Sequence, residues 1–437
     1  MNIVLLSGGS GKRLWPLSND VRSKQFIKLF KNEDDEYESM VQRVYRQISN
    51  NIDGNVTIAT SKSQVSAIRN QLGNKVSICV EPCRRDTFPA IALASAYLKY
   101  ELGVNEEDCV CVCPVDPYVD DSYYKGVASL EKYVKTGDAN LVLMGIEPTY
   151  PSEKYGYIIP ETLGEVSNVL EFKEKPTTEV AKEYISKNAL WNAGVFGFKL
   201  GYLLKKAHSL IDFSDYRDLY SKYETLKKIS FDYAVVENES KIQVVRYNGE
   251  WKDVGTWNMM TEVMSDVTKG NVKLDEKCEN TNVINELNIP VVGMGLKDLV
   301  VVASGDGILV SSKDRSDFIK PFVESLDSDI RVAEKSWGTY QVIDIQPESL
   351  TVKVSLKAGR EMSYHHHEFR DEIWNFVSGK GIIIVDGMKQ EVNAGDVIRI
   401  SSGCNHTVKA ITDLSIIEVQ VGKSINQSDK IKQETKF

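Results

Sequence analysis

The sequence predicts a doubly wound α/β domain, a short β-rich connector and a C-terminal all-β barrel. Three observations support this prediction. Strand-like and helix-like segments alternate from Met1 to about Trp257, which is typical of parallel strands joined by crossover helices. Short β-type runs separated by Gly, Asp and Asn follow from Asn271 to about Ser312. From about Glu334 to Gly422, short strands and turns succeed one another without a helical stretch.

In the first region, apolar strand-length runs and segments with helical spacing follow each other in regular order. Met40, Val41, Val44 and Ile48, for example, recur at the spacing of one helix face. The expected strands cover 2–7, 55–60, 76–80, 108–113 and 140–145, and the expected helices cover 38–48, 63–72, 89–102 and 123–134. In a Rossmann-like sheet of this kind, ligands bind beyond the carboxyl ends of the strands. Residues directly after each strand are therefore the candidates for binding and catalysis.

The chain of 437 residues is too long for one hydrophobic core, so several domains are expected. The changes of pattern divide it at 1–265, 266–330 and 331–437. In the connector, runs such as IPVVGMG and DLVVVAS are β-helix-like, and FIKPFVESL predicts a short closing helix. We expect the polar tail from Lys423 to Phe437 to be frayed.

The composition argues against some classes of protein. A net charge of −9 argues against a nucleic-acid protein held by phosphate contacts, although a local nucleotide site can still be basic. No apolar run reaches the ~18 residues that span a bilayer, and the N-terminus lacks the basic region of a signal peptide. Seven scattered cysteines, three of them alternating in DCVCVC, predict buried core thiols in a reducing compartment. We expect a cytoplasmic protein with no membrane and no nucleic-acid partner.

A glycine-rich turn follows the first expected strand. Three glycines within four positions allow the backbone to approach a ligand closely and to point its N–H groups inward. Two cations follow at once, and a third lies further on in Lys24-Gln25-Phe26. The turn fits neither a Walker A loop nor a dinucleotide fingerprint, because Arg13 and Leu14 occupy positions that those motifs reserve for other residues. The candidate phosphate-binding residues of this turn are Gly8, Gly9, Gly11, Lys12 and Arg13.

This turn begins an ordered series of motifs. After GGSGKRLWPLS and KQF, the chain contains EPCRRDT, PVD, YGYI, FKEKP, WNAG, DYA and WKDVGTW in that order. The series covers most of the first 330 residues and resembles the mannose-1-phosphate guanylyltransferases of the sugar nucleotidyltransferase family. Lys12, Ser23, Asp86 and Pro117 depart from the residues usual in that family, which are Thr, Pro, Asn and His.

The resemblance implies that a guanylyl group passes from GTP to mannose 1-phosphate, giving GDP-mannose and pyrophosphate. It implies that the three glycines cradle the triphosphate, that Arg13 and Lys24 stabilise its charge, and that Asp116 and Asp253 hold Mg²⁺. The residues that it places against the sugar phosphate are Tyr155, Gly156, Glu174, Lys175 and Asn192. Arg85 and Asp86 lie where it places the base.

Two alternative hypotheses stay open. The departures at Asp86 and Pro117 are compatible with another nucleotide or another sugar 1-phosphate. A non-catalytic nucleotide-sugar sensor is the other alternative, and it predicts that the charged residues of the loop and of the metal site are lost. Arg13, Lys24, Asp116 and Asp253 are all present.

Four of the five histidines lie in the C-terminal region, and their spacing is informative. Residues two apart on a strand share a face, so His365 and His367 are expected to face the barrel interior while His366 points away. Two or three imidazoles and the carboxylate of Glu372 suit Zn²⁺, Fe²⁺, Mn²⁺ or Ni²⁺, with Zn²⁺ first among them. The spacing is similar to that of the two cupin motifs, the first matched by Gly359, His365, His367, Glu372 and Gly379, and the second resembled by Gly395, Gly403 and His406.

The ends of this region, KSWGTY and IEVQVG, resemble the type II phosphomannose isomerase domain, which is often fused to such a transferase. The resemblance implies that mannose 6-phosphate and fructose 6-phosphate are interconverted at the metal. The central motif departs from the family at His365, Glu368, Phe369 and Ile373, so it supports metal binding and leaves isomerisation open. We also expect a homo-oligomer, namely a dimer.

Overall fold

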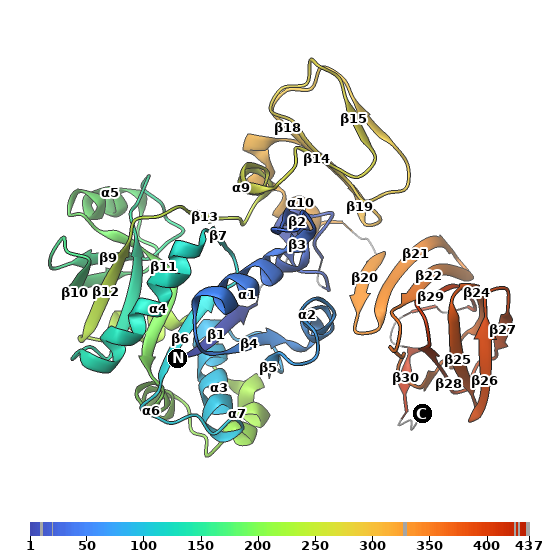
Figure 1. The fold of residues 1–437 in the computed structure, drawn as a ribbon, viewed down its shortest axis with the longest axis horizontal. Coiled ribbons are helices and arrows are strands. Elements are labelled where there is room, and N and C mark those ends of the chain that lie inside the picture. Colours follow the sequence, from blue (N-terminus) through green and yellow to red (C-terminus); the bar gives the residue numbers. More distant parts are fainter. Residues whose placement is uncertain (9–11, 20, 327–329, 424, 427–428, 434–437) are drawn as a thin grey trace. The chain divides into compact units, whose positions relative to one another are not determined.

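The computed structural model describes residues 1–8, 12–19, 21–326, 330–423, 425–426 and 429–433. The chain forms two compact units (Figure 1). The first unit consists of Met1–Gly9, Gln25–Val65 and Lys75–Ser265, and the second of Ser10–Lys24, Ser66–Asn74 and Asp266–Phe437. Gly9 and Gly11 of the predicted phosphate loop lie outside the described residues.

The first unit is built on a nine-stranded sheet with the order β5-β4-β1-β6-β11-β8-β12-β10-β9. The strands β5, β4, β1 and β6 are parallel, as the alternating pattern predicts. β11 is antiparallel to both of its main neighbours, because it begins beside the end of β8, where Trp191 pairs with Ile146. The bounds are β1 Asn2–Ser7, β4 Asn55–Ser61, β5 Ser77–Glu81, β6 Cys109–Pro114, β8 Leu141–Ile146, β9 Tyr157–Pro160, β10 Val166–Lys173, β11 Leu190–Lys199 and β12 Ile242–Tyr247.

Helices cover both faces of this sheet. α3 packs on β1, β4 and β5 together with α6, α7 and α8, whereas α4 packs on the other face and contacts α1. The alanines of α3 permit close packing, and Val4 and Ile91 belong to the core beneath that helix. The bounds are α1 Met40–Asn51, α3 Thr87–Tyr100, α4 Asp121–Thr136, α5 Thr178–Ser186, α6 Leu200–Leu210, α7 Tyr216–Lys222, α8 Phe231–Ala234 and α9 Trp257–Val263. The helix α2 Val65–Leu72 belongs, apart from Val65, to the second unit. Two two-stranded antiparallel sheets complete the unit: the hairpin of β2 Lys28–Lys31 with β3 Tyr37–Ser39, and the long-range pair of β7 Pro117–Val119 with β13 Trp251–Asp253.

The connector in the second unit contains the parallel coils that the sequence suggests. β14 Thr268–Lys269, β16 Asn282–Asn285 and β18 Leu299–Ser304 pair in parallel, as do β15 Val272–Leu274 and β17 Val291–Gly293. The last strand, β19 Gly307–Ser312, turns back on β18, and the short helix α10 covers Lys320–Glu324. The segment 12–19 with 21–24 packs on these coils, since Arg22 donates to both carboxylate oxygens of Glu286 at 2.8 and 3.0 Å.

The C-terminal part of the second unit is a barrel of two antiparallel sheets around a core that includes Trp374. One sheet has the order β20-β21-β22-β29-β24-β27, and the other β26-β25-β28-β23-β30. The bounds are β20 Val332–Lys335, β21 Gly338–Gln346, β22 Ser349–Leu356, β23 His365–His366, β24 Asp371–Ser378, β25 Lys380–Val385, β26 Met388–Asn393, β27 Val397–Ile400, β28 His406–Ala410, β29 Leu414–Val421 and β30 Ile431–Lys432.

The expectation of a frayed tail is wrong for residues 429–433. β30 pairs with β23, and the amide of Gln433 donates to the carbonyl of Tyr364. The polar composition of the tail did not indicate this pairing. Asp429 is buried although it is polar, because its carboxylate accepts hydrogen bonds from the backbone of Glu368 and Phe369.

All seven cysteines are free thiols, and the three of β6 are buried. Cys111 and Cys113 share one face of the strand, with their Sγ atoms 3.9 Å apart. Among the helices of the described residues, none is long and apolar enough to cross a membrane.

Candidate active site and candidate metal centre

Two aspartates from distant parts of the chain meet in the first unit. Asp116 follows the end of β6, and Asp253 closes β13. The antiparallel pairing of β13 with β7 sets Asp253 opposite Pro117, the residue next to Asp116. Both carboxylates line one pocket of about 240 Å³. The pairing of these two strands, which the sequence did not predict, is therefore what brings the two predicted metal ligands together.

Glu174 forms another wall of this pocket and is held in place from two sides. It is buried, and its Oε1 accepts from Lys175 Nζ at 2.6 Å. Burial alone lowers the pKa of Lys175, but the bond to Glu174 raises it above its usual range, so Lys175 is a cation at neutral pH. Gly156 lies against the other carboxylate oxygen, because a Cβ atom on this residue would lie 2.6 Å from Glu174 Oε2. A glycine is needed here to leave room for that carboxylate.

Asn192, near the start of β11, orients a third carboxylate. Its Nδ2 donates to Asp232 Oδ1 at 2.8 Å, and its Oδ1 accepts from the amide of Gly194 at 3.1 Å. Burial, and then the nearby charge of Glu174, raise the pKa of Asp232 to about 7. Asp232 is thus a pocket residue that the sequence indicated only as part of a motif, and it titrates near neutral pH.

An aromatic group closes the pocket on one side. Tyr155 and Trp251 line it, and the ring centroids of Tyr155 and Trp191 lie 4.8 Å apart. The indole N–H groups of Trp191 and Trp251 are buried and find no acceptor among the residues that the structure describes. Such groups are ready to donate to hydroxyl groups of a ligand.

The residues predicted near the base lie at the start of α3. Asp86 has a positive φ of 71° and caps the helix by accepting from the amide of Thr87, which lines the pocket. Arg85 donates instead to the carbonyl of Glu224. The structure therefore gives both residues contacts within the first unit, and neither side chain belongs to the pocket lining.

The remaining predicted phosphate-binding residues are divided between the units. Gly8 is exposed directly after β1, in the first unit. Lys12 and Arg13 begin a short 3-10 helix at Lys12–Leu14, and Lys24 begins another at Lys24–Phe26. These three cations belong to the second unit, whose loop is fixed on the connector through Arg22 and Glu286.

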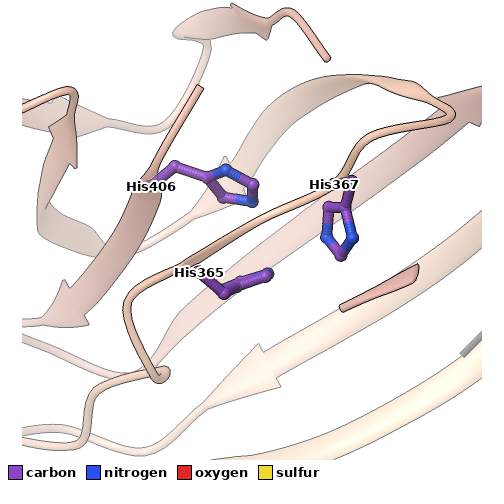
Figure 2. Close-up of side chains that lie close together, drawn as sticks. All are labelled: His365, His367 and His406. Carbon is purple, nitrogen blue, oxygen red and sulfur yellow. The ribbon is translucent and has the colours of Figure 1, made fainter. Parts of the chain in front are cut away.

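Three histidines converge inside the barrel (Figure 2). His365 on β23 pairs directly with His406 on β28, and His367 follows β23. All three are buried, and their nearest ring nitrogens lie within 4.8 Å of one another. Glu372 of β24 faces them, with Oε1 3.1 Å from His367 Nε2 and Oε2 3.2 Å from His406 Nε2. His366 is only half-buried and contacts Asn405 through its Nδ1.

Backbone carbonyl groups fix the protonation of these three rings. Each Nδ1 lies at hydrogen-bond distance from a carbonyl oxygen: His365 from Ser363 at 2.7 Å, His367 from Asp429 at 3.0 Å and His406 from Cys404 at 2.9 Å. A carbonyl accepts only, so each Nδ1 carries a proton, and in the neutral form of each ring Nε2 is the nitrogen that presents a lone pair. Burial, followed by the charge of Lys430, lowers the pKa of His365 to about 2, which keeps this ring neutral.

This arrangement fits a divalent metal ion. In their neutral forms, His367 and His406 turn the lone pairs of Nε2 toward carboxylate oxygens of Glu372, so that acceptors oppose acceptors at close range. A cation between them removes this conflict, and neutral imidazoles with one carboxylate are typical ligands of transition metals. Arg370 relieves part of it, since Nε donates to Glu372 Oε1 and Nη2 donates to His367 Nε2, both at 3.0 Å.

The sequence did not identify the second layer of polar groups around this centre. Glu418 and Gln420 of β29 are buried, and Gln420 donates to Glu418. Burial, and then the charge of Glu372, raise the pKa of Glu418 to about 8. The alternation in IIEVQV contained a signal, because it sets two polar side chains on the face of Ile416, which belongs to the barrel core.

The chain was compared with known protein families. Residues 2–270 match the family model described as nucleotidyl transferase, and residues 326–435 match the one described as mannose-6-phosphate isomerase C-terminal. The first match covers more than half of the chain and includes the pocket. The second includes the three histidines and Glu372.

Similar proteins extend over the whole chain. A mannose-1-phosphate guanylyltransferase of Escherichia coli K12 is 29% identical, over 98% of this chain and 97% of its own length. A putative mannose-1-phosphate guanylyltransferase of Vibrio cholerae is 28% identical, over 99% of both chains. A crystal structure described as mannose-1-phosphate geranyltransferase from Thermus thermophilus has a TM-score of 0.62 and 28% identity, covering 74% of this chain and 98% of that one.

Proposed function

The chain belongs to the nucleotidyl transferase family, and from this premise we propose that it transfers a guanylyl group from GTP to mannose 1-phosphate. The products are GDP-mannose and pyrophosphate. The observation that carries the proposal is the pocket in which Asp116 and Asp253 lie together with Glu174 and Asn192. Similarity to guanylyltransferases along the full length of the chain supports the choice of substrates.

The reaction joins two anions, so the protein must neutralise charge and align the attacking oxygen with the α-phosphorus. A Mg²⁺ ion suits the paired carboxylates of Asp116 and Asp253, and when bound it supplies neutralisation of the triphosphate. We assign the backbone of Gly8, and of Gly9 and Gly11, to the phosphates. We assign Lys12, Arg13 and Lys24 to the charge that shifts toward the leaving pyrophosphate.

The sugar phosphate is assigned to the rest of the pocket. Glu174 and Asn192 have fixed orientations and present oxygen and nitrogen atoms to sugar hydroxyl groups, and Lys175 supplies a cation for the sugar's phosphate. Gly156 leaves room beside Glu174, and Tyr155 supplies an apolar wall. Arg85 and Asp86 are assigned to the base on the strength of their motif.

A pyrophosphate-release assay with Mg²⁺ tests this function. GTP, ATP, UTP and CTP are each combined with the 1-phosphates of mannose, glucose and fucose. We expect turnover with GTP and mannose 1-phosphate, and little with any other pair. Turnover confined to a different pair would change the substrates and keep the reaction class, and no turnover with any pair would favour a nucleotide-sugar sensor.

A second activity is proposed for the barrel, because the histidine centre lies in the region that matches the isomerase family. We propose that it interconverts mannose 6-phosphate and fructose 6-phosphate. His365, His367, Glu372 and His406 would hold the metal, which polarises the sugar carbonyl when bound. Burial raises the pKa of Glu418, and this carboxyl group is the candidate to hold or move a proton beside that centre.

Formation of mannose 6-phosphate from fructose 6-phosphate, with and without chelator, tests the second activity. We propose Zn²⁺ as the metal, which analysis of metal content can decide. A homodimer and a cytoplasmic location stay predictions, which light scattering and cell fractionation can test.

A further inference from the structure

Three lysines of the barrel gather next to the histidine centre. Lys432 on β30 lies directly opposite His365 on β23, so the two side chains share one face of this antiparallel pair. Lys430 comes two residues earlier, and its charge acts on His365. Lys335, at the end of β20, acts in turn on Lys430. The cluster thus joins a short N-terminal strand of the barrel to its last strand.

The positive charges of this cluster are not balanced by direct partners. Among the described residues, none of the three forms an ion pair or a side-chain hydrogen bond. Other lysines of the barrel are paired, for example Lys357 with Asp413 at 3.2 Å and Lys409 with Glu361 at 3.7 Å.

Burial and clustering both lower the pKa values of the two half-buried lysines, whereas Lys432 is exposed. Burial, and then Lys432, lower the pKa of Lys335. The pKa of Lys430 is lowered to about 8, and burial is the largest cause. The charges of Glu418 and Glu372 raise this pKa, whereas those of Lys432 and Lys335 lower it further. Ammonium groups brought together and partly buried are stabilised when an anion joins them.

We propose that Lys335, Lys430 and Lys432 bind the phosphate group of a hexose 6-phosphate whose carbonyl end faces the histidine centre. This inference rests on the proposed isomerase function and names the residues that recognise its substrate. A phosphate dianion offers three oxygens to three ammonium donors, which a carboxylate cannot do. Arg370 is not available for this role, because Glu372, His367 and the carbonyl of Asn426 engage its guanidinium.

The segment 429–433 couples the two ends of this site. The carbonyl of Asp429 accepts from His367 Nδ1, and its carboxylate accepts from the amides of Glu368 and Phe369. The same segment carries Lys430 and Lys432. Its docking therefore orients one histidine ring and delivers two of the three cations.

Titration calorimetry on the full-length, metal-loaded protein tests this inference. The probes are mannose 6-phosphate, mannose and inorganic phosphate, and the variants are Lys430→Met and Lys432→Met. Each is expected to weaken binding of mannose 6-phosphate by about 10-fold or more, since a charge-assisted hydrogen bond is lost. Lys389→Met, on the exposed strand β26 of the same barrel, is the matched control and should leave binding unchanged.

Two further measurements separate the possible outcomes. Metal content should stay at the wild-type level in all variants, and Lys432→Arg should retain binding within about twofold because the charge is kept. Unchanged affinity in both methionine variants overturns the inference, as does inorganic phosphate binding as tightly as mannose 6-phosphate. Lysine-dependent binding without formation of fructose 6-phosphate supports the site and refutes isomerisation. Isomerisation with an unchanged KM for mannose 6-phosphate in the lysine variants supports the isomerase function and refutes the lysine site.

Discussion

The pocket of the first unit and the histidine centre of the barrel bury polar groups in opposite ways. The pocket collects four carboxyl groups, those of Asp116, Glu174, Asp232 and Asp253, of which Glu174 is directly paired with a lysine. In the barrel, a separate backbone carbonyl holds the Nδ1 atom of each imidazole, so the Nε2 atoms that could bind a metal are already oriented. The pocket therefore crowds acidic groups together, whereas the barrel centre gathers imidazole and carboxylate ligands for one metal ion.

The largest expected effect concerns the acidic pocket. Asp253→Asn removes one of two carboxylates that would neutralise the triphosphate through Mg²⁺, so we expect the rate of pyrophosphate release to fall by about 100-fold or more. Initial rates with GTP and mannose 1-phosphate measure this. Asp138→Asn, an exposed residue beyond the end of α4, is the control and should keep the wild-type rate. Wild-type turnover of Asp253→Asn would exclude this residue from the reaction.

A second substitution tests how far the barrel centre depends on each ring. His406→Ala leaves a gap in the donor set, so metal affinity should fall by about 100-fold or more, while pyrophosphate release is unaffected. Competition with a chromogenic chelator gives the affinity. His366→Ala is the matched control, because this neighbouring ring contacts Asn405 outside the centre. An equal loss of metal affinity in both variants would mean that the substitutions affect the folding of the barrel rather than the binding of the metal.

The same contrast explains what the sequence could predict. Three of the predicted ligands of the barrel, His365, His367 and Glu372, lie close together in the chain, and resemblance to the two cupin motifs predicted them together with His406. The pocket combines residues from Leu6 to Asp253. Only the ordered motifs pointed to them, because no local periodicity relates Asp116 to Asp253. The pairing of β7 with β13 was not predictable, since each strand has three residues.

Elements with strong local patterns were predicted well. β1 has the predicted bounds, and α1 begins two residues later than predicted, where Ser39 and Gln42 form a capping box. The antiparallel β11 was not predicted, because its apolar run is compatible with either direction. Asp429 was missed for another reason: its role is to accept backbone hydrogen bonds, which composition does not reveal.

A smaller effect is expected from the shape of the pocket. In Gly156→Ala, the new Cβ would lie 2.6 Å from Glu174 Oε2 and 2.9 Å from the ring of Phe172, so the carboxylate must move. Overpacking of this size costs ~1–3 kcal/mol, and we expect KM for mannose 1-phosphate to rise by about 10-fold. Gly164→Ala serves as control, since its nearest neighbour would lie at 3.5 Å. An unchanged KM in Gly156→Ala would show that Glu174 does not contact the sugar.

The smallest effect concerns stability and exposes the charge balance of the pocket directly. Asp232 has a pKa of about 7 in the folded chain, against 3.8 ordinarily, so the folded state binds the extra proton between these values. Stability from this group is full below pH 4 and is lost as pH rises through 7. The variant Asp232→Asn does not lose stability in this way, and its Oδ1 can still accept a hydrogen bond from Asn192 Nδ2. We expect the variant to match the wild type near pH 4 and to be more stable at pH 8 by ~2 kcal/mol.

Calorimetry at several pH values, following the transition that shifts with GTP and Mg²⁺, measures this difference for the first unit. The barrel supplies the internal reference, because its transition should keep the same pH dependence in both proteins. A stability difference independent of pH would mean that Asp232 is ionised throughout. The repulsion between it and Glu174 would then be too weak to raise its pKa, and the crowding of acidic groups, on which the contrast with the barrel rests, would have no measurable effect on stability.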